Sequence, residues 1–261
     1  MKTIIEFKNV HKAFDGHPVL SGASLAVEKG ETLTIIGGSG MGKSVFLKLL
    51  LGVVRPDSGE IFFDGIDICD MGEKKLSKMR RRIGMLFQGA ALFDSLSVKE
   101  NVAYPLREHF EYSEEEISDI VSKKLSMVGL FDIGNMMPAD LSGGMKKRVG
   151  LARAIATDPD VILYDEPTTG LDPANTKRIC NLISQLQEKL KVTSIVVTHD
   201  MEAAFSVTDR MAMIYDKKFG FVGTGEEARS SADPVVQNFI KGEMETGDGS
   251  AVGGEKWSRG V

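Results

Sequence analysis

Residues 37–44 read Gly-Gly-Ser-Gly-Met-Gly-Lys-Ser, a glycine-rich loop that ends in Lys-Ser. The apolar run 33–36 before it is typical of a strand, and residues 45–51 after it favour a helix. A glycine, four residues and then Gly-Lys-Ser between a strand and a helix is the pattern of a phosphate-binding loop. A glycine-rich turn with a chance Lys-Ser is the alternative, and the two flanking elements argue against it. The sequence therefore predicts a strand–loop–helix unit that binds nucleotide phosphates.

Each residue type in this loop has a physical task. Glycines let the backbone approach the phosphates and direct its N–H groups at them, and the helix that follows presents its positive N-terminal end to the same anion. Lys43 is expected to reach the β- and γ-phosphates, and Ser44 to ligate Mg²⁺. Nucleotide contacts are expected from Gly37, Gly38, Ser39, Gly40, Met41, Gly42, Lys43, Ser44 and Val45.

Composition excludes several classes of protein. The chain has 261 residues, 42% of them apolar and 26% charged, which is enough for a sizeable core in one large domain or two small ones. Its net charge of −5 supplies no global basic field for nucleic acid and no attraction to an anionic membrane surface. We therefore expect no nucleic-acid partner.

Cysteine usage and hydropathy indicate the compartment. Cys69 and Cys180 are the only two cysteines and stand far apart, so a disulfide framework is disfavoured and a reducing compartment is favoured. The N-terminus lacks the continuous apolar stretch of a signal peptide, and no run approaches the roughly 20 apolar residues of a spanning helix. We expect a soluble, cytosolic protein whose membrane role, if any, comes through a partner.

The chain alternates between strand and helix patterns. Strands are predicted at 4–14, 19–27, 59–64, 83–87, 161–164 and 194–198, with a closing hairpin of 211–215 and 219–223. Helices are predicted at 74–82, 98–104, 117–128, 142–156, 176–190 and 202–207. The second helix is expected to end at Pro105, and the third to open with a capping box at Ser113 and stop at Gly129. This repetition predicts an α/β core interrupted by an inserted helical block.

An acidic pair ends one of the apolar strands. Asp165 and Glu166 follow the run 161–164, and α/β proteins place ligand chemistry at the carboxyl ends of strands. Asp165 fits the acidic group that holds Mg²⁺ near a phosphate-binding loop, and Glu166 fits a carboxylate that polarises an attacking water. Taken alone, these two residues would be better interpreted as an ordinary acidic strand end. Downstream of a phosphate-binding loop, the interpretation as site residues is the better one.

A second helix start has features of an anion site. The run Leu141-Ser142-Gly143-Gly144-Met145 precedes a helix rich in Ala, Leu and Arg. Ser142 is a good N-cap, and the glycines expose backbone N–H groups. A simple capped helix after a turn remains a fair interpretation of these residues in isolation.

Five motifs in order give the chain a family resemblance. They are the loop 37–44, Gln88 after a strand, residues 141–144, Asp165-Glu166 and His199. Over approximately residues 2–240 the chain resembles the ATP-binding-cassette ATPases. The resemblance implies an α/β fold with a P-loop NTPase core, an antiparallel β subdomain and an inserted α-helical subdomain at about 89–158. It implies one ATP-binding domain over 1–242. The Gly- and Ser-rich segment 243–261, which contains Trp257, is expected from its composition to be a disordered tail.

The same resemblance implies a role for each motif. Two subunits are expected to form a head-to-tail homodimer with two ATPs between them, in which Ser142, Gly143 and Gly144 of one subunit close on the γ-phosphate held by the other. The resemblance makes Glu166 the general base and His199 a contact to the γ-phosphate that orients the water. Gln88 is expected to contribute to Mg²⁺ and water placement, Asp172 to lie in the cross-dimer loop, and Phe14 to stack on adenine.

Two residues depart from the family pattern. Phe14 stands where the family usually has Tyr, so stacking is kept and a hydroxyl is lost. Met145 stands where the signature usually ends in Gln, so one polar side chain at the dimer interface is lost. These departures bear on the rate of hydrolysis more than on its existence.

A finer resemblance lies in residues 85–93, in residues 101–109 and in Met145. Together they are similar to the ATPases of Mla/Mce-type phospholipid transporters. The implied partners are an integral-membrane permease, a lipid-binding Mce-domain protein and a small STAS-domain subunit, at the cytoplasmic side of an inner membrane. The permease is expected to dock on residues 89–105, where Phe93, Leu96, Val98 and Tyr104 either line a groove or pack inside the helical block.

Three alternatives stay open beside phospholipid transport. A soluble ATPase of DNA repair or translation is disfavoured because the chain has one cassette and no sustained heptads. A nucleotide-binding scaffold that does not hydrolyse is disfavoured because Lys43 and Glu166 are present. An ATPase for amino acids or another small solute differs only in the finer motifs, since the cassette itself contacts no transported substrate.

Overall fold

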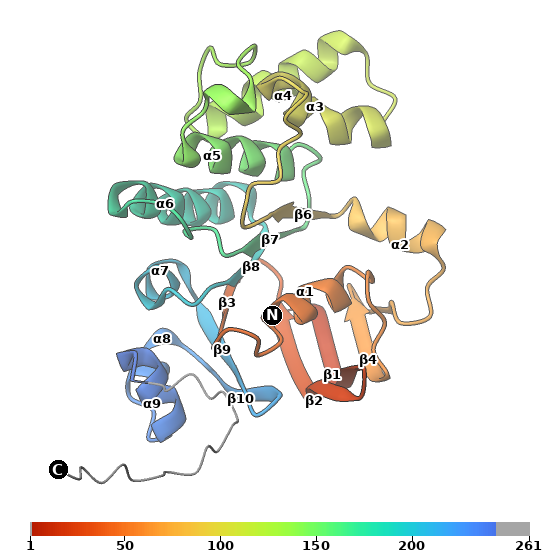
Figure 1. The fold of residues 1–261 in the computed structure, drawn as a ribbon. Coiled ribbons are helices and arrows are strands. Elements are labelled where there is room, and N and C mark those ends of the chain that lie inside the picture. The colour runs from red at the N-terminus through yellow and green to blue at the C-terminus, as the bar shows by residue number, and fades with distance from the viewer. Residues whose placement is uncertain (1, 244–261) are drawn as a thin grey trace, which may run out of the picture.

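The computed structural model describes residues 2–243, which form two β-sheets and the helices around them (Figure 1). A four-stranded sheet has the order β2-β1-β4-β5, and a six-stranded sheet has the order β10-β9-β3-β8-β7-β6. The predicted tail lies outside the described residues from position 244 onward, as does Trp257.

The four-stranded sheet is antiparallel. It contains β1 (Thr3–Phe14), β2 (His17–Glu28), β4 (Ser58–Phe63) and β5 (Ile66–Asp67). Asp15 and Gly16 both have positive φ, 49° and 78°, between β1 and β2. A two-residue turn with two positive φ angles matches the twist of a tight hairpin, so β2 begins earlier than the predicted residue 19.

The six-stranded sheet is parallel except at one edge. It contains β3 (Thr32–Ile36), β6 (Ile83–Leu86), β7 (Val161–Asp165), β8 (Thr193–Val197), β9 (Arg210–Tyr215) and the antiparallel β10 (Lys218–Gly223). Both faces are covered, because Leu163 packs in one core while Ile162 and Tyr164 pack in another. Parallel strands buried on both faces have nearly continuous apolar sequences, which is why these runs were recognisable.

Helix α1 (Lys43–Leu50) lies between the two sheets. Its Phe46 stacks on Phe7 of β1 with ring centroids 4.4 Å apart, and the same cluster contains Leu33 and Ile35 of β3. Helix α2 (Glu73–Arg80) connects the antiparallel sheet to β6. The glycine-rich loop is therefore anchored on both sides by buried apolar residues.

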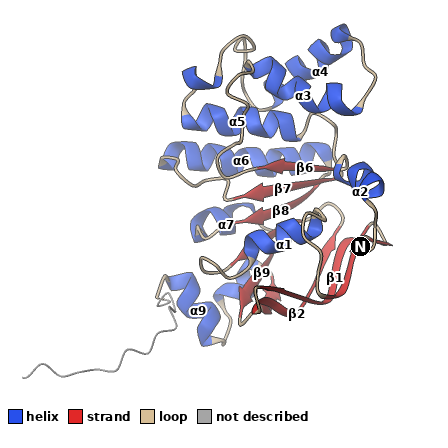
Figure 2. Cartoon of the chain, turned by 45° about the vertical axis from the view of Figure 1, so that its right-hand side comes forward, coloured by secondary structure: helices blue, strands red, loops and turns tan. Residues whose placement is uncertain are grey.

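The other face of the parallel sheet is covered by a stack of helices (Figure 2). Helices α5 (Gly143–Ala154) and α6 (Pro173–Leu190) lie next to the sheet, and α3 (Val98–His109) and α4 (Glu114–Met127) lie beyond α5. The remaining helices are α7 (Met201–Val207), α8 (Gly225–Arg229), α9 (Pro234–Lys241) and the short η1 (Pro138–Asp140).

The structure confirms the predicted fold class and most elements, corrects the predicted end of one helix, and decides between two alternatives for Val98. The capping box at Ser113 is present with Glu116, and it opens α4. The predicted end of a helix at Pro105 is wrong: α3 continues to His109, because one missing N–H is outweighed by the burial of Leu106 beyond it. Val98 does not line a groove, since it is fully buried in the helical core.

Four short elements were not predicted, namely β5, η1, α8 and α9. Each has eight residues or fewer, so none offers a long periodic pattern. Within residues 2–243, no helix combines the length and apolar character needed to cross a membrane.

Candidate functional site

A cavity of about 690 Å³ lies where the ends of several strands meet the glycine-rich loop. We call it the loop cavity. Its walls come from β2, the loop after β3, and the segments that end or follow β6, β7 and β8, which is where parallel α/β sheets gather ligand-binding residues. It is lined by Val19, Ser39, Gly40, Gly42, Lys43, Ser44, Val45, Gln88, Asp165, Glu166, Val197 and His199.

Two glycines of the loop cannot carry a side chain. Gly37 has φ 153°, and a Cβ there would lie 2.8 Å from the carbonyl oxygen of Ile214. Gly42 has φ 98°, and a Cβ there would lie 3.0 Å from Cγ1 of Val19. The loop thus passes close to its neighbours and then enters α1 directly at Lys43, so that backbone N–H groups at the helix start face the cavity.

Lys43 is held inside the loop that precedes it. Its side chain is 8% exposed, and Nζ donates to the carbonyl oxygens of Gly37 at 2.7 Å and Gly38 at 3.0 Å. Burial lowers the pKa of Lys43, while the nearby charges of Glu166 and Asp165 act in the opposite direction. The ammonium group is therefore fixed by the backbone and faces two carboxylates across the cavity.

The acidic pair is the negative wall of the loop cavity. Burial raises the pKa of Asp165, the charge of Glu166 raises it further, and Lys43 and Lys147 oppose the shift. Glu166 adopts a left-handed backbone with φ 47°, and its N–H donates to the carbonyl oxygen of Val197 at 2.8 Å. Such a conformation is unfavourable for a residue with a Cβ and is found disproportionately at functional sites.

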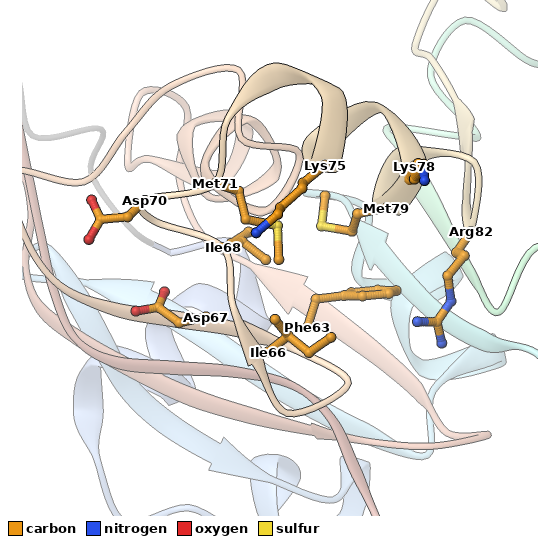
Figure 3. A pocket seen from close by; sticks show the side chains of 10 residues that line it. All are labelled: Phe63, Ile66, Asp67, Ile68, Asp70, Met71, Lys75, Lys78, Met79 and Arg82. Carbon is orange, nitrogen blue, oxygen red and sulfur yellow. The ribbon is translucent and has the colours of Figure 1, made fainter.

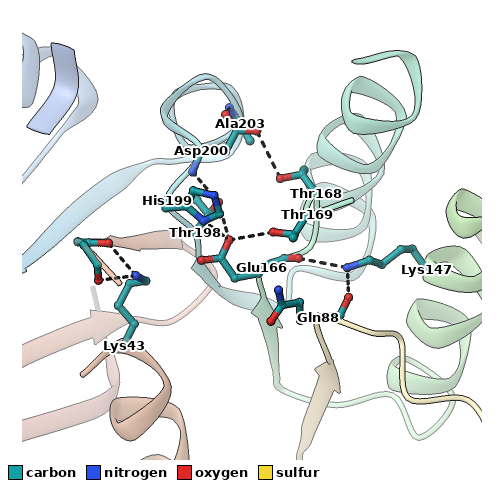
Figure 4. A network of polar contacts seen from close by, with 12 residues as sticks. Lys43, Gln88, Lys147, Glu166, Thr168, Thr169, Thr198, His199, Asp200 and Ala203 are labelled. Atoms are coloured by element: carbon teal, nitrogen blue, oxygen red, sulfur yellow. Dashed lines mark hydrogen bonds and ion pairs between the residues drawn. The ribbon is translucent and has the colours of Figure 1, made fainter. Parts of the chain in front are cut away.

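One oxygen of the Glu166 carboxylate receives several hydrogen bonds (Figure 4). His199 Nδ1 lies 2.9 Å from Oε2, and the hydroxyls of Thr169 and Thr198 donate to the same oxygen at 3.3 and 3.4 Å. Among residues 2–243, no group donates to the other oxygen, Oε1. The network orients the carboxylate and leaves one oxygen to act on a ligand.

A residue that the sequence analysis missed connects two of the predicted ones. Lys147 of α5 is 5% exposed, and its Nζ donates to the carbonyl oxygens of Gln88 and Glu166, the latter at 3.1 Å (Figure 4). Its spacing from Gly144 and Leu151 places it on the buried face of α5, and that periodicity was the available signal. Thr169 and Thr198 were also missed, and no sequence pattern singles them out.

Some predicted site residues lie away from the loop cavity. Phe14 is an exposed ring at the end of β1, with Lys12 Nζ 5.2 Å from its centroid. Ser142 and Gly143 are exposed at the start of α5, where the Ser142 hydroxyl caps the helix by accepting from Met145 N–H at 3.3 Å. Gly144 packs against Asn175, since a Cβ would lie 2.8 Å from its Oδ1. None of these residues lines the loop cavity of a single chain.

The loop cavity has the chemistry of a magnesium site. Ser44, Gln88 and Asp165 line it and supply a hydroxyl, an amide carbonyl and a carboxylate, the hard oxygen ligands that Mg²⁺ prefers. In the described part of the chain, no three or more His, Cys, Asp and Glu side chains are grouped to hold a metal ion. Mg²⁺ usually takes only one or two protein carboxylates beside phosphate oxygens, so the donors present fit the ion.

A second cavity, of about 530 Å³, lies between the β4–β5 hairpin and α2 (Figure 3). Phe63, Ile68, Met71 and Met79 form its apolar part, and Lys75 and Arg82 lie at its edge. None of the predicted site residues lines it. The loop cavity is therefore the candidate functional site.

Comparisons with known proteins identify the family of the chain. Residues 20–169 match the family model described as ABC transporter. The chain is 45% identical over 244 residues to the intermembrane phospholipid transport system ATP-binding protein MlaF of Haemophilus influenzae, covering 94% of this chain and 92% of that protein. It is 42% identical over 242 residues to the probable ribonucleotide transport ATP-binding protein mkl of Mycobacterium leprae, covering 93% and 70%.

The fold also matches a solved structure. A dimeric ATP-binding cassette in a post-hydrolysis state, bound to ADP and Pi, superposes with a TM-score of 0.78 at 33% identity. The match covers 85% of this chain and 98% of that one.

Proposed function

The chain belongs to the ABC transporter family of ATP-binding proteins and is an ATPase, and from that premise we propose that it drives phospholipid movement between membranes as the nucleotide-hydrolysing subunit of a transporter. The observation that carries the proposed chemistry is the convergence of Lys43, Gln88, Glu166 and His199 on one cavity at the glycine-rich loop. Four separate stretches of sequence supply these residues, and only the fold brings them together.

In the proposed reaction the loop holds the phosphates of ATP. Backbone N–H groups of residues 37–44 and the Lys43 ammonium bind the β- and γ-phosphates and offset their charge. Ser44, Asp165 and Gln88 are the residues that would hold Mg²⁺, and the ion would supply positive charge to offset the negative charge that develops on the phosphates.

Glu166 is the proposed general base. Its carboxylate takes a proton from water as the water oxygen bonds to the γ-phosphorus, and the bond from that phosphorus to the β-phosphate oxygen breaks. ADP and inorganic phosphate leave, and the proton passes from Glu166 to solvent or product. His199 holds Oε2 in place and contacts the γ-phosphate, so that Oε1 is directed at the water.

We propose that the site is completed by a second copy of the chain. Ser142 and Gly143 are exposed at the N-terminus of α5, a 12-residue helix, and they lie outside the loop cavity of their own subunit. A helix start with exposed backbone N–H groups suits the γ-phosphate held by a partner. Such a head-to-tail homodimer is stable only while ATP supplies that contact, so hydrolysis opens it. Phe14, exposed at the end of β1, would stack on the adenine.

A groove on the helical side suits a membrane-embedded partner. It has a volume of about 470 Å³, and we call it the aromatic groove after Phe87, Phe93 and Tyr104, whose rings are partly exposed there. Arg80, Arg81 and Arg153 also line it. It adjoins Gln88, so we propose that a permease helix docks in it and senses the nucleotide site through this segment.

The remaining partners follow from the phospholipid assignment. We propose that the protein lies at the cytoplasmic side of an inner membrane, bound to its permease, with a STAS-domain subunit and an Mce-domain lipid-binding protein in the same assembly. The segment 89–158 is proposed to act as one helical subdomain, which carries the partner-facing Ser142 and forms one wall of the aromatic groove.

The substrate is tested with the whole transporter. The complex is purified with its permease, placed in vesicles containing fluorescent phospholipid, and supplied with ATP and Mg²⁺. We expect ATP-dependent lipid transfer that is lost in Lys43→Ala, because that variant lacks the phosphate-binding ammonium. A relative named for ribonucleotide transport favours a second candidate, and ATP-dependent movement of labelled ribonucleotide with no lipid transfer would replace the first.

A further inference from the structure

Lys147 bridges two backbone segments that the chain brings to the nucleotide from different places. Its Nζ donates to the carbonyl oxygens of Gln88, 59 residues earlier, and Glu166, 19 residues later. These carbonyls follow β6 and β7, which are neighbours in the parallel sheet. One ammonium group of α5 therefore holds two adjacent strand ends at a set spacing.

Both bridged residues direct their side chains into the loop cavity. A carbonyl held by a hydrogen bond fixes its peptide plane and so limits where the adjoining side chains can go. Near-attack geometry is sensitive to small displacements, and an error of about 1 Å in a reacting group costs roughly 100-fold in rate. The bridge therefore acts on the two side chains that the proposed reaction requires to work on one nucleotide.

The surroundings of Lys147 favour a positively charged side chain. An isolated buried ammonium is strongly unfavourable. Burial lowers the pKa of Lys147, and two carbonyl oxygens and the nearby charges of Asp165 and Glu166 offset part of the cost of burying its charge. An apolar side chain of the same length would fill the space but leave both carbonyls without their donor. Space filling alone thus does not account for a lysine at this position.

The helix that carries Lys147 also contacts the aromatic groove. Arg153, further along α5, donates to the carbonyl oxygens of Ala90 at 2.8 Å and Ala91 at 2.7 Å. Ala90 and Ala91 both have positive φ, so this segment is held in an unfavourable backbone conformation. Lys147 and Arg153 thereby attach the segment 88–91 to α5, whose first turn contains Gly143.

We propose that Lys147 is a positioning residue for ATP hydrolysis, which holds the backbones of Gln88 and Glu166 at the spacing their side chains need. The inference rests on the roles proposed above for those two residues. Lys147 does not line the loop cavity, so it acts through them and not by binding the nucleotide.

The test compares Lys147→Met, which keeps the length and removes the donors, with Lys147→Gln, which keeps two N–H donors on one nitrogen. We expect kcat of Lys147→Met to fall roughly 10- to 100-fold while KM for ATP and the affinity for a fluorescent ATP analogue change less than about twofold. Lys147→Gln should retain more activity than Lys147→Met. Lys146→Met is the matched control, because Lys146 is the neighbouring lysine of α5 and its side chain makes no hydrogen bond or ion pair within residues 2–243, while its backbone N–H keeps its bond to Ser142.

A double variant separates positioning from general damage. Single-turnover phosphate release from labelled ATP is measured for Glu166→Gln alone and combined with Lys147→Met. If Lys147 acts through Glu166, the second change should add little to the loss caused by the first. Any of three results would overturn the proposal. The first is a wild-type kcat in Lys147→Met, and the second is an equal loss of single-turnover rate from Lys147→Met with and without Glu166→Gln. The third is a parallel change of kcat and nucleotide affinity. Wild-type turnover in Glu166→Gln would instead overturn the general-base assignment.

Discussion

The Nδ1 atom of His199 lies 2.9 Å from Oε2 of Glu166, although the two residues are 33 positions apart in the chain. The contact joins the segment after β8 to the residue after β7, and these strands are parallel neighbours. His199 is largely exposed and Glu166 is largely enclosed, and both residues line the loop cavity. This pair is the basis for the first two predictions.

Replacing Glu166 by Gln should stall hydrolysis and spare nucleotide binding. An amide has nearly the same shape as the carboxylate but cannot accept the proton, so kcat should fall roughly 10²- to 10⁴-fold. Steady-state phosphate release and binding of a fluorescent ATP analogue measure the two effects. Mass in solution with ATP and Mg²⁺ should show a trapped dimer, and turnover at the wild-type rate would contradict the assignment.

Replacing His199 by Ala should lower kcat more than it raises KM. The change removes one of three hydrogen bonds to Oε2 and leaves those from Thr169 and Thr198, so Glu166 is less well oriented but still present. We expect the loss to be smaller than that of Glu166→Gln, and the measurement is kcat for both variants under the same conditions. His11→Ala serves as a control, because His11 lies on β1 and does not line the loop cavity. A loss for His199→Ala as large as that for Glu166→Gln would mean that the proposed contact of His199 to the γ-phosphate matters more than its hydrogen bond to Oε2.

Replacing Ser142 by Arg should block dimer closure without preventing one subunit from binding ATP. Ser142 is exposed and lies outside the loop cavity, so the long cation obstructs the surface proposed to meet a second copy, and it also removes the N-cap hydrogen bond from Met145 N–H. In the Glu166→Gln background, light scattering should detect a monomer with ATP. Ser122→Arg, an exposed serine of α4, should leave the ATP-dependent dimer intact. A dimer in Ser142→Arg would remove the proposed role of this motif.

Replacing Tyr104 by Ser should uncouple the ATPase from its membrane partner. Tyr104 lies 4.8 Å from Phe93, centroid to centroid, in the aromatic groove, and it is not part of the loop cavity. We expect stimulation of ATP hydrolysis by the permease to fall at least fivefold, which corresponds to roughly 1 kcal/mol or more of lost contact energy. The ATPase rate of the isolated subunit should change little. Tyr112→Ser is the control, since Tyr112 is equally exposed at 41% but lies outside the groove.

Replacing Asp64 by Asn should reduce stability at neutral pH and have no effect in strong acid. Hydrogen bonds from Lys2 and Arg82 lower the pKa of Asp64 to about 2. Because the folded pKa lies below the unfolded value of roughly 3.9, the ion pairs stabilise the fold above that value and lose their effect as pH falls toward 2.

The measurement is Tm for both proteins from pH 7 to pH 2. The pairs are partly exposed, so we expect a difference at pH 7 equivalent to about 1 kcal/mol or less, closing below roughly pH 4. Asp64 has φ 50°, which Asn tolerates. Asp15→Asn is the control, with φ 49° and no ion pair among the described residues, and it should shift Tm equally at every pH. A pH-independent difference for Asp64→Asn would contradict the electrostatic cause.

Local chemistry made much of the fold predictable. The capping box at Ser113 involves only residues three positions apart, and the strand 161–164 is apolar throughout because both faces are covered. The glycine-rich loop is recognisable because the backbone conformations and close approaches at Gly37 and Gly42 disfavour a side chain. The end predicted at Pro105 was wrong because tertiary burial of Leu106, which lies outside any local rule, kept the helix intact.

By itself, the sequence determined which residue types were available for chemistry, since each motif is a short run with its own local pattern. Tertiary structure alone decided that Glu166 Oε2 accepts from His199 and Thr198, and that Lys147 reaches the carbonyl of Gln88. These contacts join segments up to 59 residues apart and depend on the order of strands in the sheet. Strand order is set by packing across the whole core, which no local pattern encodes.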